Sequence, residues 1–169
     1  MQRHNFSPPH RLRIGGLTRG GLVEALKTSA VLLNATAKAL LEDAVFDQVE
    51  VEDVEIVERT VGELGFPDGA TLFQVFAAAQ ERGLRLCPPT AGPWMRLSML
   101  DQQTAPDSIM SKGRAPSGSI TVASIPLRED DEYPKGFYLR VVDGVPWLRG
   151  YRCTEQHNWS ADDWLLFRL

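Results

Sequence analysis

The pair of residues with the clearest chemical potential is Cys87 and His157. A cysteine becomes a nucleophile when a base stabilises its thiolate, and His157 is the only histidine outside the first ten residues. Glu155 or Asp162 would then orient the imidazole ring. Cys87, His157 and Asp162 together define one hypothesis, a small hydrolase or transferase. No known cysteine-hydrolase signature surrounds Cys87, and a free cysteine is more often a small buried hydrophobe.

A zinc site is the second chemistry that these residues suggest. Cys153 and His157 lie four positions apart, as two ligands on one helical turn would, and Cys87 would supply a third ligand. Zinc sites normally contain a second close-spaced pair of ligands, which this sequence lacks. We therefore expect no metal and no other cofactor, and we expect the two cysteines to be reduced thiols.

Aromatic and basic residues concentrate near the end of the sequence. Trp159, Tyr151, Arg149 and Arg152 form a candidate ligand-binding set, because aromatic rings and guanidinium groups stack on planar ligands and on peptide side chains. Tryptophans in strands more often pack in the core. Trp159, however, lies in a polar connector, residues 153–163, where a core position is less natural. The connector is therefore where we expect a binding site.

Two further readings concern the first part of the chain. A glycine cluster over 15–21 precedes an expected helix and could hold a phosphate, but the Gly-Lys-Ser/Thr of a P-loop is missing, so a flexible loop is favoured. Expected helices over 20–27 and 34–43 have the lengths of a helix-turn-helix, and residues 1–45 hold six Arg and Lys against three Asp and Glu. This suggests a DNA-associated protein as a third hypothesis.

The overall charge argues against nucleic acid as the partner. The net charge is −4 and the pI is about 5.4, so the molecule lacks the basic field that draws proteins onto phosphate backbones. The acidic stretch from Glu50 to Glu63 lacks the glycine and the alternating oxygen ligands of a calcium loop. It is more typical of a solvated strand edge, where charges suppress aggregation.

The elements that would position these residues follow from periodicity. Apolar residues at helical spacing predict the helices over 20–27 and 34–43 and a third over 70–82, with Thr18 or Gly20 near the start of the first and Asn34 capping the second. β-Branched and alternating patterns predict strands over 54–61, 119–126, 137–142, 145–151 and 164–168. Asp143-Gly144 is a strong hairpin signal.

These elements predict an α+β fold in one domain. A helical N-terminal half would pack on a mainly antiparallel sheet, because helices precede residue 83 and most strands follow residue 118. Residues 1–16 are expected to be a loose N-terminal segment and 101–117 an exposed loop, while 93–100 fits either a helix or a strand.

The remaining expectations concern location and function. The first ten residues lack the apolar region of a signal peptide, and no run approaches about 18 apolar residues, so we expect a cytoplasmic protein without a membrane segment. The leading hypothesis is a non-catalytic binding or interaction module. The partner and the oligomeric state stay open.

Overall fold

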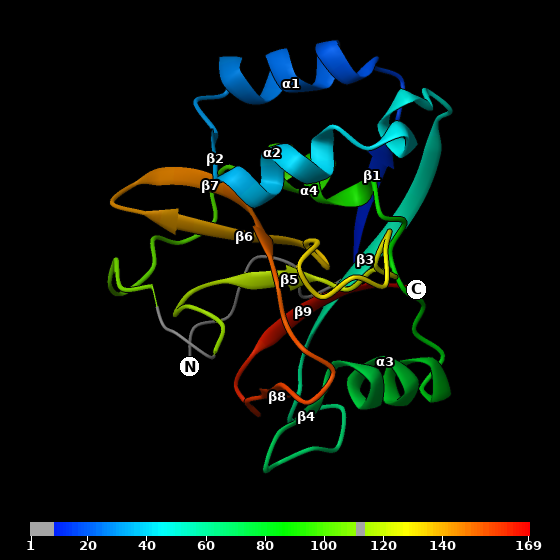
Figure 1. Ribbon diagram of the computed structural model, residues 1–169, viewed down its shortest axis with the longest axis vertical. Helices are drawn as coiled ribbons and strands as arrows, with labels where there is room; N and C mark the ends of the chain where they lie inside the picture. The colour runs from blue at the N-terminus through cyan, green and yellow to red at the C-terminus, as the bar shows by residue number, and fades with distance from the viewer. Residues whose placement is uncertain (1–8, 111–113) are drawn as a thin grey trace.

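A seven-stranded mixed sheet lies at the centre of the fold (Figure 1). The computed structural model describes residues 9–110 and 114–169. The last strand in sequence, β9, lies inside the sheet, antiparallel to β3 and parallel to β5. In spatial order the strands are β1 (His10–Ile14), β3 (Glu52–Thr60), β9 (Trp164–Arg168), β5 (Ile120–Val122), β6 (Gly136–Val142), β7 (Val145–Tyr151) and β2 (Leu32–Leu33).

A short two-stranded ladder and five helical segments complete the described elements. Side-chain caps start several of the helices: Thr18 accepts from the backbone of Gly21, Asn34 accepts from Ala37, and Thr71 forms a capping box with Gln74. The ladder pairs β4 (Ala70–Thr71) with β8 (Asn158–Trp159), and the helical segments are α1 (Arg19–Thr28), α2 (Ala35–Leu41), the 3-10 helix η1 (Ala44–Asp47), α3 (Leu72–Glu81) and α4 (Ala91–Ser98).

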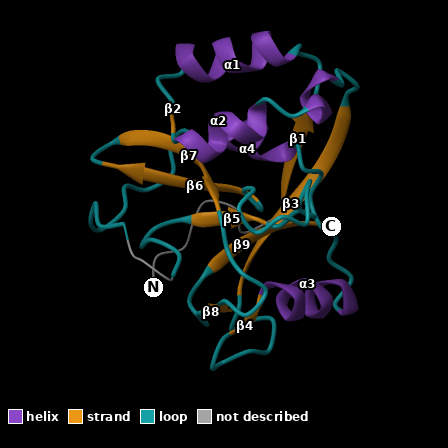
Figure 2. Ribbon diagram, in the orientation of Figure 1, coloured by secondary structure: helices purple, strands orange, loops and turns teal. Residues whose placement is uncertain are grey.

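The helices divide between two hydrophobic clusters. Buried residues of α1, α2 and α4, such as Leu26, Leu40 and Met95, share the first cluster with one set of strand residues. Val75 of α3 and Trp159 of β8 belong to the second cluster. Figure 2 shows α1, α2 and α4 on one side of the sheet and α3 apart from them on the other.

Two wholly buried arginines connect the sheet to neighbouring segments. Arg96 of α4 donates to the side chain of Gln102 at 2.8 Å and to the carbonyl oxygens of Met99 and Trp147. Burial lowers the pKa of Arg96 to about 10. Arg140 of β6 donates to the carbonyl oxygens of Ser117 at 2.9 Å and Asp107 at 2.8 Å. Such bonds satisfy charges that would otherwise be costly to bury.

The α+β class is confirmed, with corrections. The sheet is mixed and not mainly antiparallel, because β5 pairs in parallel with β9 and β2 with β7. The helices are not confined to the first half, since residues 91–98 form α4. The strand expected over 119–126 is only three residues long.

The two segments expected to be irregular are partly ordered. Residues 10–14, placed in a loose N-terminal segment, form β1 and pair with β3, so that prediction is wrong for them; residues 1–8 lie outside the described part. Within 101–117 the described residues form no helix or strand, but Gln102 and Ala105 are buried. Ala105 also donates its backbone N–H to the carbonyl of Val141. This loop is therefore anchored at its start.

The described helices were also compared with the dimensions of a bilayer. None of the helices in 9–110 and 114–169 combines the length and the apolar character needed to cross a membrane.

Candidate functional site

A cavity of about 360 Å³ opens beside the connector, and we call it the connector pocket. Its size is that of a small-molecule site. Strands β5, β6 and β7, the start of α2, the end of the 101–117 loop and the connector each contribute to its wall. The lining residues are Asn34, Thr36, Met110, Arg114, Ala115, Pro116, Ser119, Thr121, Tyr138, Gly150, Tyr151, Arg152, Cys153, His157 and Trp159.

Trp159 is the centre of an aromatic group in this wall. The ring of Tyr151 meets it edge to face at a centroid distance of 5.6 Å, and the ring of His157 does so at 5.5 Å. Such perpendicular contacts are favourable for aromatic pairs. Trp159 is only 4% exposed, so it is both a core residue and a wall residue. The expectation that a core position is less natural for Trp159 is wrong.

Two polar atoms of this aromatic group lack hydrogen-bond partners. The Oη of Tyr151 and the Nε1 of Trp159 are buried, and neither has a partner among the described residues. Burial raises the pKa of Tyr151, so the phenol stays a neutral donor across the physiological pH range. An unpaired buried polar group costs about 1–3 kcal/mol. A bound polar molecule reaching either group would recover part of that free energy.

The charges in the wall have one sign. Arg114 and Arg152 are its cationic residues, and the described lining residues include no Asp or Glu. Arg152 donates through Nε to the carbonyl oxygen of Glu132 at 2.5 Å, which fixes part of the side chain. The cavity is therefore positive on a molecule whose net charge is −4.

The junction between α2 and β7 builds one side of the pocket. The Oδ1 of Asn34 accepts from the backbone of Ala37 and, at 2.9 Å, from the backbone of Gly150. Thr36 donates its hydroxyl to the carbonyl of Gly150 at 2.8 Å. A Cβ at position 150 would lie 2.8 Å from the carbonyl carbon of Thr36. Only glycine allows this close approach.

The same junction bears on the DNA hypothesis. The start of α2 is bonded to the sheet, and Ala37, Leu40 and Leu41 are buried. The exposed side of this seven-residue helix offers one cation, Lys38. This arrangement gives no support to α2 as a DNA recognition helix.

Cys87 lies apart from the connector pocket. It is 3% exposed within the first hydrophobic cluster, and its thiol donates to the carbonyl of Leu166 at 3.5 Å. Burial raises the pKa of this thiol to about 12. His157, in contrast, lines the pocket, and Asp162 is exposed and does not line it. The structure does not bring the three proposed catalytic residues together in this pocket.

The other predicted residues divide in a similar way. Tyr151, Arg152 and Trp159 line the pocket, while Arg149 does not: its guanidinium stacks on Trp147 at 4.2 Å. Cys153 and His157 both line it, but the described residues contain no group of three or more His, Cys, Asp or Glu that could hold a metal ion. The zinc reading therefore gains no support from these residues.

The sequence does not predict most of the residues that line the connector pocket. Asn34 was interpreted only as a helix cap, and its second bond to Gly150 depends on tertiary contact. Ser119 and Thr121 lie in an expected strand, where hydroxyls among apolar residues were the available signal. Met110 and Arg114 belong to the polar loop, whose position no periodicity predicts.

Comparisons with known protein families, with curated proteins and with solved structures find no significant match. We therefore infer a function from the geometry of this chain's own residues.

Proposed function

We propose that this protein is a non-catalytic binding module whose connector pocket holds a small planar organic anion. The observation that carries this proposal is the composition of the wall: three aromatic residues, Tyr138, Tyr151 and Trp159, lie with two arginines and without a carboxylate. Aromatic faces favour a flat ring, and guanidinium groups favour carboxylate or phosphate.

Hydroxyl groups in the wall would complete recognition of such a ligand. Thr36, Ser119 and Thr121 also line the cavity; Thr36 and Ser119 donate to the carbonyl oxygens of Gly150 and Pro116, which leaves the buried hydroxyl of Thr121 as the donor for a ligand. A few polar groups placed among apolar ones are typical of small-molecule sites. The unpaired donors of Tyr151 and Trp159 add to this set.

The enzyme hypothesis has weaker support. A nucleophilic cysteine needs a thiolate, whereas burial favours the protonated form of Cys87. The DNA hypothesis also lacks a presented basic helix. The proposal places the protein in the cytoplasm, where a reducing environment would maintain Cys87 and Cys153 as the free thiols that the structure contains.

Calorimetric titration with phenyl phosphate tests the proposal. Phenyl phosphate should bind, and benzyl alcohol, which carries no charge, should bind at least tenfold more weakly. The Arg152→Gln variant should also bind phenyl phosphate about threefold more weakly, because Arg152 is exposed and an exposed charge pair contributes up to about 1 kcal/mol. Arg11→Gln is the matched control, because Arg11 is an exposed arginine of β1 outside the pocket.

The Trp159→Phe variant locates the site. In the wild-type protein, the NMR resonance of the Trp159 indole N–H should shift when phenyl phosphate binds. The variant keeps an aromatic ring in the core and removes this N–H, so it identifies the resonance. Equal affinity for the charged and neutral probes, or equal losses in Arg152→Gln and Arg11→Gln, would contradict an anion site in this pocket.

A further inference from the structure

A second cavity, of about 370 Å³, lies on the side of the sheet that carries α1 and α4, and we call it the helix-side pocket. It is formed where β1 ends, where the chain approaches β3, and where α4 begins. The lining residues are Ile14, Gly15, Leu17, Leu22, Val45, Phe46, Gln48, Glu50, Val51, Glu52, Pro88, Pro89, Thr90 and Trp94.

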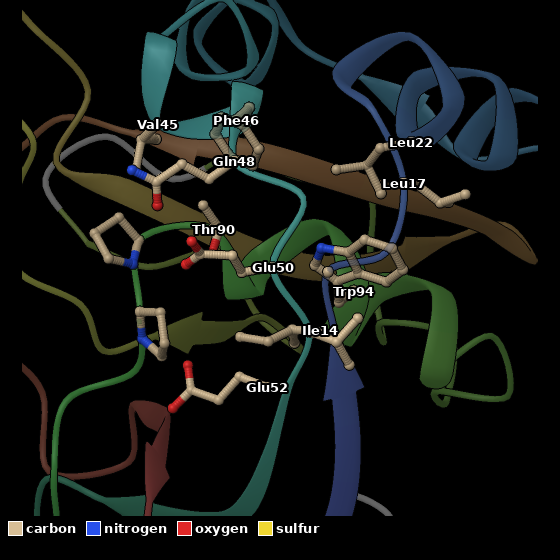
Figure 3. Close-up of a pocket in the computed structure, with 14 residues that line it drawn as sticks. Ile14, Leu17, Leu22, Val45, Phe46, Gln48, Glu50, Glu52, Thr90 and Trp94 are labelled. Carbon is tan, nitrogen blue, oxygen red and sulfur yellow. The ribbon is translucent and has the colours of Figure 1, made fainter.

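The helix-side pocket has two chemically different sides (Figure 3). The polar ends of Gln48, Glu50 and Glu52 lie along one side, with Val45 and Phe46 next to Gln48. Ile14 and Trp94 lie on the other, with Leu17 and Leu22 beyond them. A ligand that fills both sides needs a polar end and an apolar body.

The charge on the polar side is negative. Glu52 has a cationic partner, since its Oε1 lies 2.6 Å from Nη2 of Arg168. The carboxylate of Glu50 makes no hydrogen bond or ion pair with the described residues. The described lining residues include no Lys, Arg or His. The pocket therefore has one exposed carboxylate without a cationic partner beside an apolar, aromatic wall.

Two glycines fix the segment that carries Glu50. Gly15 has a φ of +92°, and a Cβ there would lie 1.8 Å from the carbonyl oxygen of Glu50. Gly16 donates its backbone N–H to the carbonyl of Val49 at 3.0 Å. These glycines come from the cluster interpreted above as a flexible loop or a phosphate site. Here they fix the backbone that carries Glu50, and a carboxylate at this place is opposite to what a phosphate would require.

We propose that the helix-side pocket binds a small organic cation, a protonated amine carried on an apolar body. The ammonium group would pair with Glu50, and the apolar body would contact Ile14 and Trp94. A tryptophan ring also attracts a nearby cation through its π face. Charge complementarity separates this site from the positive connector pocket, so the two sites select opposite ligands.

Calorimetric titration with phenethylammonium tests this inference, with neutral 2-phenylethanol as the comparison. The cation should bind about threefold more tightly than the alcohol, because the carboxylate of Glu50 that would pair with it is exposed. Glu50→Gln should weaken binding of the cation about threefold, because Glu50 is exposed and an exposed ion pair contributes up to about 1 kcal/mol. Glu24→Gln should leave the affinity unchanged, because Glu24 is an exposed acid of α1 outside the pocket.

A second variant tests the aromatic side. Trp94→Leu keeps an apolar side chain but removes the ring. It should weaken binding of phenethylammonium about threefold and should weaken binding of 2-phenylethanol less. Urea unfolding would establish that each variant is folded. No measurable binding of phenethylammonium, equal binding of the alcohol, or equal effects of Glu50→Gln and Glu24→Gln would each overturn the inference.

Discussion

Among single residues, Cys87 shows how position determines reactivity. Its thiol donates to the carbonyl of Leu166 and is almost fully buried, and the pKa rises from 9.0 to about 12. Desolvation disfavours the charged form of any acid, so the same residue type that makes a strong nucleophile in a polar cleft is inert in a core.

The raised pKa of Cys87 predicts a loss of stability at alkaline pH. As the pH rises above 9, the unfolded chain releases the thiol proton while the native chain keeps it, so the free energy of unfolding falls. This one group should remove about 1.4 kcal/mol by pH 10. Urea unfolding at pH 8 and pH 10 measures this loss. Between these pH values, Cys87→Ser should lose less free energy of unfolding than the wild type, because a serine hydroxyl does not titrate in this range.

Cys153→Ser is the comparison for this measurement. Burial also raises the pKa of Cys153, but that residue is only half-buried. Its replacement should therefore change the pH dependence less than Cys87→Ser does. Parallel pH profiles for the wild type and Cys87→Ser would show that the thiol does not titrate differently on unfolding.

Among the elements, the approach of α4 to β6 depends on one glycine. A Cβ at Gly92 would lie 2.6 Å from a ring carbon of Phe137, so the helix could not keep its distance from the sheet. Gly20 in α1 is the opposite case: no atom lies within 4 Å of a Cβ built there.

This contrast predicts opposite effects of the same substitution. Gly92→Ala should lower the free energy of unfolding by about 1–3 kcal/mol through overpacking. Gly20→Ala should raise it by about 0.5–1 kcal/mol, because alanine restricts the unfolded chain and favours the helix. Urea unfolding of both variants measures the difference. A Gly92→Ala variant as stable as the wild type would mean that α4 shifts without penalty.

The elements also show what could be predicted from sequence and why. α3 and the strands at 137–142, 145–151 and 164–168 have a clear apolar period or turn signal, and they form at those positions. The apolar pattern over 93–100 fits either a helix or a strand. The packing of α4 on β1 and β6 favours the helix. β1 is only five residues long and follows a polar, proline-containing start, so the sequence predicts a loose segment there. Its pairing with β3, with ion pairs from Arg11 to Glu55 and from Arg13 to Asp53, depends on tertiary contact.

The candidate site was predictable only in part for a similar reason. The concentration of aromatic and basic residues near the end of the sequence predicts Trp159, Tyr151 and Arg152 as ligand-binding residues, and all three line the connector pocket. Whether Cys87 and His157 meet depends on which strands neighbour each other, and no local pattern determines the insertion of β9 between β3 and β5. The carboxylate of Glu50 was interpreted correctly as solvated, but the apolar wall opposite it comes from distant segments.

For the whole molecule, the two pockets differ in charge and belong to different parts of the core. Ile14 and Phe46 of the helix-side pocket are members of the first hydrophobic cluster, whereas Trp159 of the connector pocket is a member of the second. Sites without shared residues are expected to act independently.

Independence predicts additive stabilisation by the two probes. Phenyl phosphate and phenethylammonium, each at ten times its dissociation constant, should each raise the free energy of unfolding by about 1.4 kcal/mol. Together they should raise it by about twice that amount. A joint effect that departs from the sum by more than about 0.5 kcal/mol would show that the pockets are coupled through the sheet.

The position of β9 inside the sheet also has a consequence for synthesis. Residues 164–168 leave the ribosome after every other strand of the sheet, yet they separate β1 and β3 from β5, β6 and β7. Until they emerge, the nascent chain holds two incomplete sheets whose facing edges have no partner. Unpaired edges are sites of intermolecular pairing, so we expect the risk of aggregation to be greatest before residues 164–168 emerge from the ribosome.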